Sequence, residues 1–133
     1  MSNDPNRRAR KPRDIADRVA EFLAQGDLDG VVSMFHPQCS ICFPLDEPPK
    51  IGHAAVREIF APLCEIRPKR ISKILGELIN GDTALLQAEW RFEDSSGNII
   101  AAGQSTEVAK KWVCETWGYY IDCPLGAPPP SSA

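Results

Sequence analysis

Two periodicities divide the chain into a largely helical first half and a β-rich second half. Between residues 13 and 63, apolar side chains recur mainly every three or four positions, which is typical of amphipathic helices. After Pro68 the spacing becomes two, the alternation expected of strands with one buried face. Helices followed by a run of strands predict an α+β domain whose helices pack on one face of a curved antiparallel sheet.

The first two helices have recognisable ends. The first starts near Arg13 and stops at Gly26, a residue type that commonly ends helices. Asp27 is suited to cap the second helix. We expect that helix to carry Phe35 as its last apolar position and to end before Pro37.

A short strand and a loop are expected between the second and third helices. Residues 40–43 favour a strand closed by Pro44, and the polar residues 45–50 favour a loop. The third helix follows Gly52, and Pro62 is expected to kink it or to end it early.

Four strands, separated by turn signals, are expected after the helices. Their ranges are 71–79, 83–92, 99–108 and 117–121. A curved sheet with three helices in its concavity encloses a conical pocket, and a ligand would bind there.

The 133 residues, 43% of them hydrophobic, suffice for one domain with a real core. We expect the domain to span residues 13–126. The basic stretch 1–12 and the stretch 127–133, rich in Pro and Ser, are expected to be disordered tails.

Charge and composition limit the classes of binding partner that we expect. Five of the 15 basic residues and one of the 18 acidic residues lie in the first thirteen positions, so the rest of the chain has 10 basic and 17 acidic residues. Such a body repels phosphate backbones, so only the tail could bind nucleic acid. No apolar run has the length of a membrane span, and no export signal is evident, so we expect a cytoplasmic protein without a membrane partner. The five cysteines are expected to be free thiols.

Two stretches resemble a known group of proteins. GDLDGVVSMFHPQCSICFPLDEPPKIGHAAVREIF (26–60) resembles the opening of ketosteroid isomerases and of the wider SnoaL-like branch of the nuclear-transport-factor-2-like superfamily. STEVAKKWVCETWGYYIDCPLG (105–126) resembles the closing strands of bacterial homologues. The resemblance implies a cystatin-like α+β cone, usually a homodimer joined through its sheet faces. It also implies a pocket for a small hydrophobic molecule and chemistry without a metal or organic cofactor.

The resemblance does not carry over the catalytic groups. Ketosteroid isomerases use an aspartate base, with a tyrosine and a protonated aspartic acid that stabilise the dienolate. Alignment on residues 26–30 puts Phe43 at the base and Val19 at the tyrosine, with Gln104 near the second acid. Phenylalanine cannot accept a proton, and valine cannot donate a hydrogen bond.

Two polar residues are candidates for relocated chemistry. Asp122 could act as an acid or base, because an apolar pocket would raise the pKa of its carboxyl; alternatively, it caps a turn at the strand end. Gln104 could hydrogen-bond a carbonyl group or only fix the side chains of its strand. If Gln104 faces inward, Thr106 shares its face and Glu107 points away.

The remaining candidate ligand contacts are aromatic or apolar. Trp90 is the best candidate for a large pocket wall, with ordinary core or dimer interface as alternatives. The full set of expected ligand contacts is Val19, Phe43, Trp90, Thr106 and Tyr120.

Four residues between positions 36 and 53 are of types that bind zinc. His36, Cys39, Cys42 and His53 are zinc-ligand types. The three-residue offset between the cysteines sends their side chains to opposite faces of a strand, so we expect no metal.

Besides binding of a polyanion by the basic tail, two classes of function are open. One is a cofactor-independent isomerase or cyclase that moves a proton on a carbonyl-bearing ligand. The alternative is a non-catalytic ligand-binding or dimerisation module on the same fold.

Overall fold

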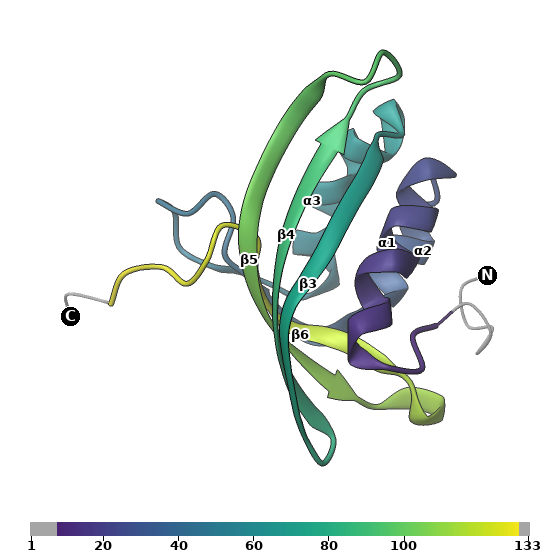
Figure 1. Ribbon diagram of the computed structural model, residues 1–133. Helices are drawn as coiled ribbons and strands as arrows, with labels where there is room; N and C mark the ends of the chain where they lie inside the picture. Colours follow the sequence, from purple (N-terminus) through teal and green to yellow (C-terminus); the bar gives the residue numbers. More distant parts are fainter. Residues whose placement is uncertain (1–7, 131–133) are drawn as a thin grey trace.

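The computed structural model describes residues 8–130, which form one curved six-stranded sheet with helices against its concave face (Figure 1). A 3-10 turn, η2 (Pro12–Asp14), precedes α1 (Ile15–Ala24), and the later helices are α2 (Leu28–Ser33) and α3 (Gly52–Ile66). The strands are β1 (Phe35–Ile41), β2 (Lys50–Ile51), β3 (Lys69–Asn80), β4 (Thr83–Glu93), β5 (Ile99–Lys111) and β6 (Trp117–Cys123). A second 3-10 turn, η3 (Val113–Glu115), joins β5 to β6.

The sheet has the strand order β2-β1-β6-β5-β4-β3, and the predicted α+β fold class is confirmed. Neighbouring strands pair antiparallel except β1 and β6, which run parallel. Register shifts interrupt the β3–β4, β4–β5 and β5–β6 pairings. Such bulges bend strands and increase their twist, which suits a sheet that curves around the helices.

The boundary between the second helix and the first strand was predicted wrongly. The helix ends at Ser33, and Phe35 opens β1 instead of closing the helix. The reason lies far away in the sequence, because the amide of Tyr119 donates a hydrogen bond to the carbonyl oxygen of Met34 at 2.9 Å. Pairing with β6 thus converts residues that look helical locally into a strand.

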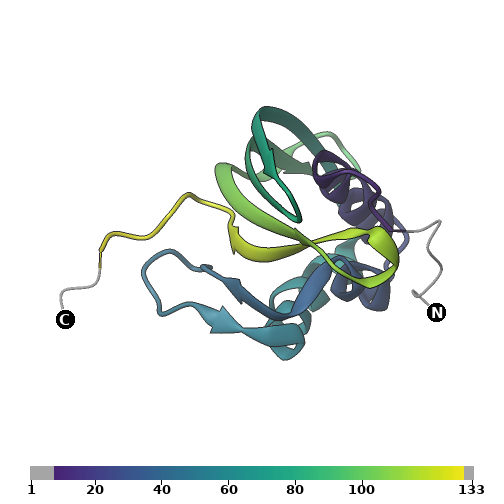
Figure 2. The ribbon, with the colours of Figure 1, turned by 90° about the horizontal axis from the view of Figure 1, so that it is seen from below.

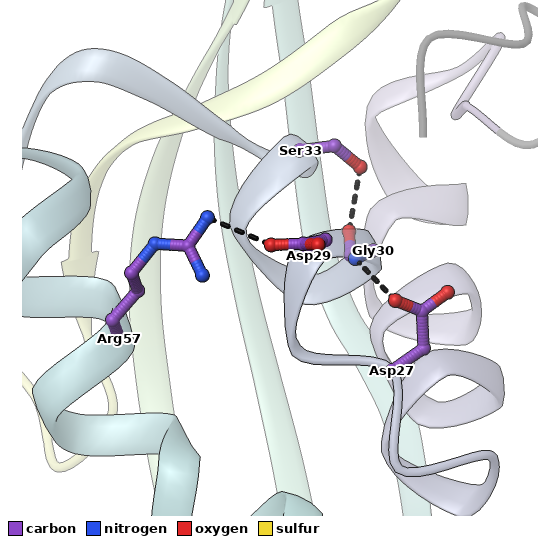
Figure 3. Close-up of polar contacts among 5 residues, drawn as sticks. All are labelled: Asp27, Asp29, Gly30, Ser33 and Arg57. Atoms are coloured by element: carbon purple, nitrogen blue, oxygen red, sulfur yellow. Dashed lines mark hydrogen bonds and ion pairs between the residues drawn. The ribbon is translucent and has the colours of Figure 1, made fainter. Parts of the chain in front are cut away.

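Helix α2 is short and is held by polar contacts at both ends (Figure 3). The carboxylate of Asp27 accepts a hydrogen bond from the amide of Gly30 at 2.8 Å, and the hydroxyl of Ser33 donates to the carbonyl of Gly30 at 2.6 Å. An ion pair of 2.8 Å between Asp29 and Arg57 joins α2 to α3. These contacts fix the helical layer that faces the sheet.

Helix α3 continues past Pro62 to Ile66, so the proline does not end it early. The four later strands lie where the alternation predicts them, extended by a few residues at most. None of the described helices is long and apolar enough to cross a membrane.

The first described residues are packed against the domain. Ala9 is fully buried, and its carbonyl oxygen accepts a hydrogen bond from the amide of Trp117 at 2.9 Å. The guanidinium of Arg8 donates to the carbonyl of Ser33 at 3.0 Å. The predicted disorder of residues 1–12 therefore does not hold at Arg8 and Ala9, because Ala9 forms an antiparallel bridge with Trp117, the first residue of β6. Residues 1–7 and 131–133 lie outside the described part of the chain, and 127–130 are exposed without helix or strand.

Candidate functional site

A cavity of about 380 Å³ lies between the helices and the concave face of the sheet. Most of its wall is carbon. The apolar wall includes Val19, Phe35, Ile59, Phe60, Trp90 and Phe92. These side chains come from α1, β1, α3 and β4, so the cavity is formed only when the helical layer closes on the sheet.

One part of the cavity wall is polar. The polar lining residues are Arg70, Ser105, Glu107, Tyr119 and Asp122. Glu107 on β5 is the registered partner of Asp122 on β6, and the two side chains are 3% and 6% exposed. Two buried carboxyl groups therefore face the same cavity from neighbouring strands.

A bulge in β6 brings Tyr119 and Asp122 to the same face. Tyr119 pairs with Ala109 and Ile121 pairs with Val108, so Tyr120 is the extra residue between them. Strict alternation would put residues 119 and 122 on opposite faces. The extra residue reverses the alternation, so both polar side chains enter the cavity wall.

The buried carboxyl groups repel each other's negative charge. The pKa of Asp122 is raised to about 8, first by burial and then by the charge of Glu107, while the charge of Arg70 opposes the shift. Burial also raises the pKa of Glu107. The pKa of the Tyr119 hydroxyl lies well above its ordinary value, mainly because that group is buried. At neutral pH, Asp122 is thus a neutral acid and Tyr119 a neutral phenol.

Arg70 provides the positive charge of this cluster. It lies on β3 opposite Phe92 and lines the cavity. Its Nε is buried and has no hydrogen-bond partner in the described part of the chain. The positive charge of Arg70 lowers the pKa of both carboxyl groups, and its side chain also hydrogen-bonds the hydroxyl of Tyr119.

Four residues singled out from the sequence line the cavity: Val19, Phe43, Trp90 and Asp122. Val19 is almost fully buried, and Phe43 packs against the core while partly exposed. The positions that align with the isomerase base and tyrosine thus contribute carbon to the wall. Asp122 faces the cavity, and its backbone is held by the amide of Cys42, which donates to its carbonyl oxygen at 2.9 Å.

The other three candidates do not line the cavity. Gln104 is exposed and pairs with Glu89, so the structure places its side chain on the outer face of the sheet and not in the cavity wall. Thr106 shares its outer face. Tyr120, at the bulge, lies against His36 with ring centroids 5.4 Å apart instead of entering the cavity.

The polar lining residues of β5 were missed because the inward face of that strand was assigned one residue out of step. Ser105 and Glu107 face inward, whereas Ile100 and Val108, which alternation puts on the same face as Gln104, are partly or largely exposed. The signal available in the sequence was the apolar face of β4, because cross-strand partners share a face. Using that signal requires the register between β4 and β5, which alternation alone does not fix.

The two histidines that were considered as zinc ligands make other contacts. Nε2 of His53 lies 2.8 Å from the carbonyl oxygen of Phe35, and Nδ1 of His36 accepts a hydrogen bond from the amide of Gln38 at 3.1 Å. Among the described residues, no group of three or more His, Cys, Asp or Glu side chains is placed to hold a metal ion.

Solved structures share this fold at low sequence identity. A protein of unknown function from Mycobacterium tuberculosis superposes with a TM-score of 0.71 at 17% identity, covering 84% of this chain and 70% of that one. A ketosteroid isomerase-like protein from Erwinia carotovora atroseptica gives 0.66 at 15% identity, covering 84% and 90%. A cystatin-like domain of unknown function from Nostoc punctiforme gives 0.69 at 12% identity, covering 85% and 73%.

No curated protein has a significantly similar sequence. The sequence profile of the SnoaL-like domain, in contrast, matches residues 16–118. This match runs from α1 into β6 and includes most of the cavity wall. The suspected relationship is confirmed, and the chain belongs to the SnoaL-like domain family, within the nuclear-transport-factor-2-like superfamily.

Proposed function

We propose that this protein binds a small, largely apolar, carbonyl-bearing molecule and moves a proton on it without a cofactor, as an isomerase or cyclase does. The observation that carries the proposal is the neutral carboxyl group of Asp122 on the wall of an otherwise apolar cavity. A carboxylic acid that stays protonated near neutral pH can donate a hydrogen bond or a proton to a carbonyl oxygen.

The carboxyl pair supplies both halves of a proton shift. Asp122 gives its proton to the carbonyl oxygen, while Glu107, acting in its carboxylate form, removes a proton from the adjacent carbon to form the enol. Return of a proton to another carbon, with loss of the enol proton to Asp122, completes an isomerisation and restores both carboxyl groups. The neutral hydroxyl of Tyr119 is a second donor for the developing oxyanion.

The polar groups of the cavity do not occupy the positions of the ketosteroid isomerase groups, so the proposed chemistry is a different arrangement and not what is left of that site. Val19 and Phe43 occupy the positions of the tyrosine and the base in the alignment, and both line the cavity with carbon. The acid, the carboxylate and the phenol instead come from β5 and β6. A ligand would therefore place its oxygen toward these two strands.

The test is exchange of protons next to a carbonyl group. In D₂O at pH 7, the wild-type protein should catalyse deuterium incorporation into 2-tetralone, followed by NMR. The variant Asp122→Asn should lose about a hundredfold or more of this rate, because it cannot donate or accept the proton. Asp46→Asn is the matched control, since Asp46 is an exposed loop residue that does not line the cavity.

A non-catalytic binding module is the alternative, favoured by the carbon at Val19 and Phe43. The same experiment separates the two. Saturable binding of 2-tetralone without exchange by the wild type supports the binding module, and equal exchange by wild type and Asp122→Asn rules out the proposed role of Asp122.

An apolar row on the outer sheet face supports a further part of the proposal, a homodimer. Leu78, Leu85, Val108 and Ile121 are registered partners across β3, β4, β5 and β6. The two leucines are 68% and 44% exposed, and Ile121 is 39% exposed. Covering such a row removes apolar surface from water. Light scattering should give a dimer for the wild type and a monomer for Leu85→Lys; a monomeric wild type contradicts this part.

A further inference from the structure

The chain beyond β6 returns to the cavity before it leaves the domain. Pro124 and Leu125 follow Cys123, the last residue of the strand, and both line the cavity. The amide of Gly126 then donates to the carbonyl oxygen of Cys123 at 3.0 Å, in a turn that Gly126 permits with a φ of 92°. Figure 2 shows the chain running away from the body after this point.

Trp90 holds the segment in place from the opposite side of the wall. Its indole Nε1 donates a hydrogen bond to the carbonyl oxygen of Pro124 at 2.8 Å. Trp90 also lines the cavity and is 9% exposed. One side chain thus forms part of the apolar wall and anchors the segment that crosses it.

Leu125 is seated where β5 has no side chain. A Cβ atom added to Gly103 would lie 2.8 Å from Cδ2 of Leu125, 3.1 Å from Cζ2 of Trp90 and 3.2 Å from the carbonyl oxygen of Pro124. Gly103 is also the registered partner of Trp90. Glycine at this position therefore allows the segment to approach the strand closely.

We propose that residues 124 and 125 form a closing wall of the cavity, held by Trp90, and that Leu125 limits the length of the ligand. This inference rests on the ligand-binding part of the proposed function. The Trp90 hydrogen bond joins the segment to β4, and the Gly126 bond closes its turn, while Leu125 stays 39% exposed.

Two fluorescent ketones test the length limit. Prodan and laurdan share one uncharged naphthyl ketone head, and laurdan carries the longer acyl chain. The wild-type protein should prefer prodan, and Leu125→Ala should reduce that preference about tenfold or more, because a hydrophobic wall discriminates ligands by their excess length. Gly103→Ala should act in the same direction by displacing Leu125. Leu75→Ala is the matched control, since Leu75 is a half-exposed leucine of β3 that does not line the cavity.

The same prodan-to-laurdan ratio in the wild type and in Leu125→Ala overturns the length limit, even where both ketones bind. If the wild type binds neither ketone, the proposed ligand site fails, and the anchor is judged separately by hydrogen exchange. The amide of Gly126 should exchange several-fold faster in Trp90→Phe than in the wild type. An unchanged exchange rate overturns the anchoring role of Trp90. A circular dichroism melt of each variant confirms that it is folded.

Discussion

Glu107 and Asp122 lie directly opposite each other on β5 and β6, with both carboxyl groups buried in the cavity wall. Like charges at this position in a sheet are destabilising, and burial away from water makes them more so. The protein relieves the repulsion by keeping Asp122 protonated near neutral pH and by placing Arg70 in the same wall. A pair that holds one proton can both give and take a proton.

The contribution of Asp122 to the free energy of unfolding should fall as the pH rises from about 4 to about 8. In the folded protein the pKa of Asp122 is about 8, compared with an ordinary value of 3.8. Between these values the unfolded chain releases the proton and the folded protein keeps it, so deprotonation favours unfolding. The contribution of Asp122 to the free energy of unfolding is complete below pH 3.8 and is lost as the pH rises toward about 8. Above that pH it does not change further. Urea unfolding of Asp122→Asn should show a smaller decline than the wild type, since of the two buried carboxyl groups only Glu107 still titrates.

Relative to the wild type, Asp122→Asn should therefore gain roughly 1 kcal/mol of unfolding free energy for each pH unit between pH 5 and pH 7. Asp46→Asn, at an exposed loop position, should follow the wild type. A difference that stays constant with pH would show that the Asp122 carboxyl is ionised in the folded protein.

The neighbours of Asp122 should move its pKa in opposite directions. The charge of Glu107 raises this pKa and that of Arg70 lowers it. Glu107→Gln should therefore lower the pKa of Asp122, and Arg70→Gln should raise it. Carbon-13 NMR of the side-chain carboxyl, assigned with Asp122→Asn, reports both changes. Because burial is the largest cause, the pKa in Glu107→Gln should stay above 3.8; a return to that value would make charge repulsion the main cause.

Two aspartates near α2 should differ in their importance for stability. Asp27 caps the helix through the amide of Gly30, whereas Asp29 forms an exposed ion pair with Arg57 (Figure 3). Asp27→Ala should lower the free energy of unfolding by about 1 kcal/mol, because an amide at the helix start loses its acceptor. Asp29→Ala should change it by a few tenths of a kcal/mol, as exposed pairs do. Equal losses in urea unfolding would contradict the capping role.

Local patterns in the sequence predicted what local forces decide. Alternation in the second half predicted the long strands, and helical spacing predicted α1 and α3, so the fold class followed. The end of α2 was missed because Phe35 pairs with Tyr119, 84 positions later in the chain. The buried segment at Ala9 was missed for a similar reason, since its partner is Trp117.

The site was predicted less well than the fold because it depends on which alternate residues of each strand face the cavity. A shift by one residue moves a whole strand face from the cavity to solvent. On β5 this shift exchanged Gln104 for Glu107, and on β6 the bulge at Tyr120 put Tyr119 in the wall. Asp122 was identified because its proposed chemistry, a carboxyl in an apolar pocket, does not depend on the register of β5.

A carboxylate at position 43 should weaken ligand binding in a pH-dependent way. Phe43 lines the cavity with carbon at the position that the alignment assigns to the isomerase base. In Phe43→Asp, an ionised carboxyl in this wall would lose hydration when an apolar ligand covers it. Prodan should therefore bind more weakly to Phe43→Asp than to Phe43→Asn above neutral pH, and the two variants should converge at low pH as the new carboxyl becomes neutral. Comparison with Phe43→Asn removes the effects of lost ring volume and of the titration of Asp122, which both variants share. Equal binding to both variants at every pH would place the ligand away from position 43 and would leave the wall at β5 and β6 as its binding surface.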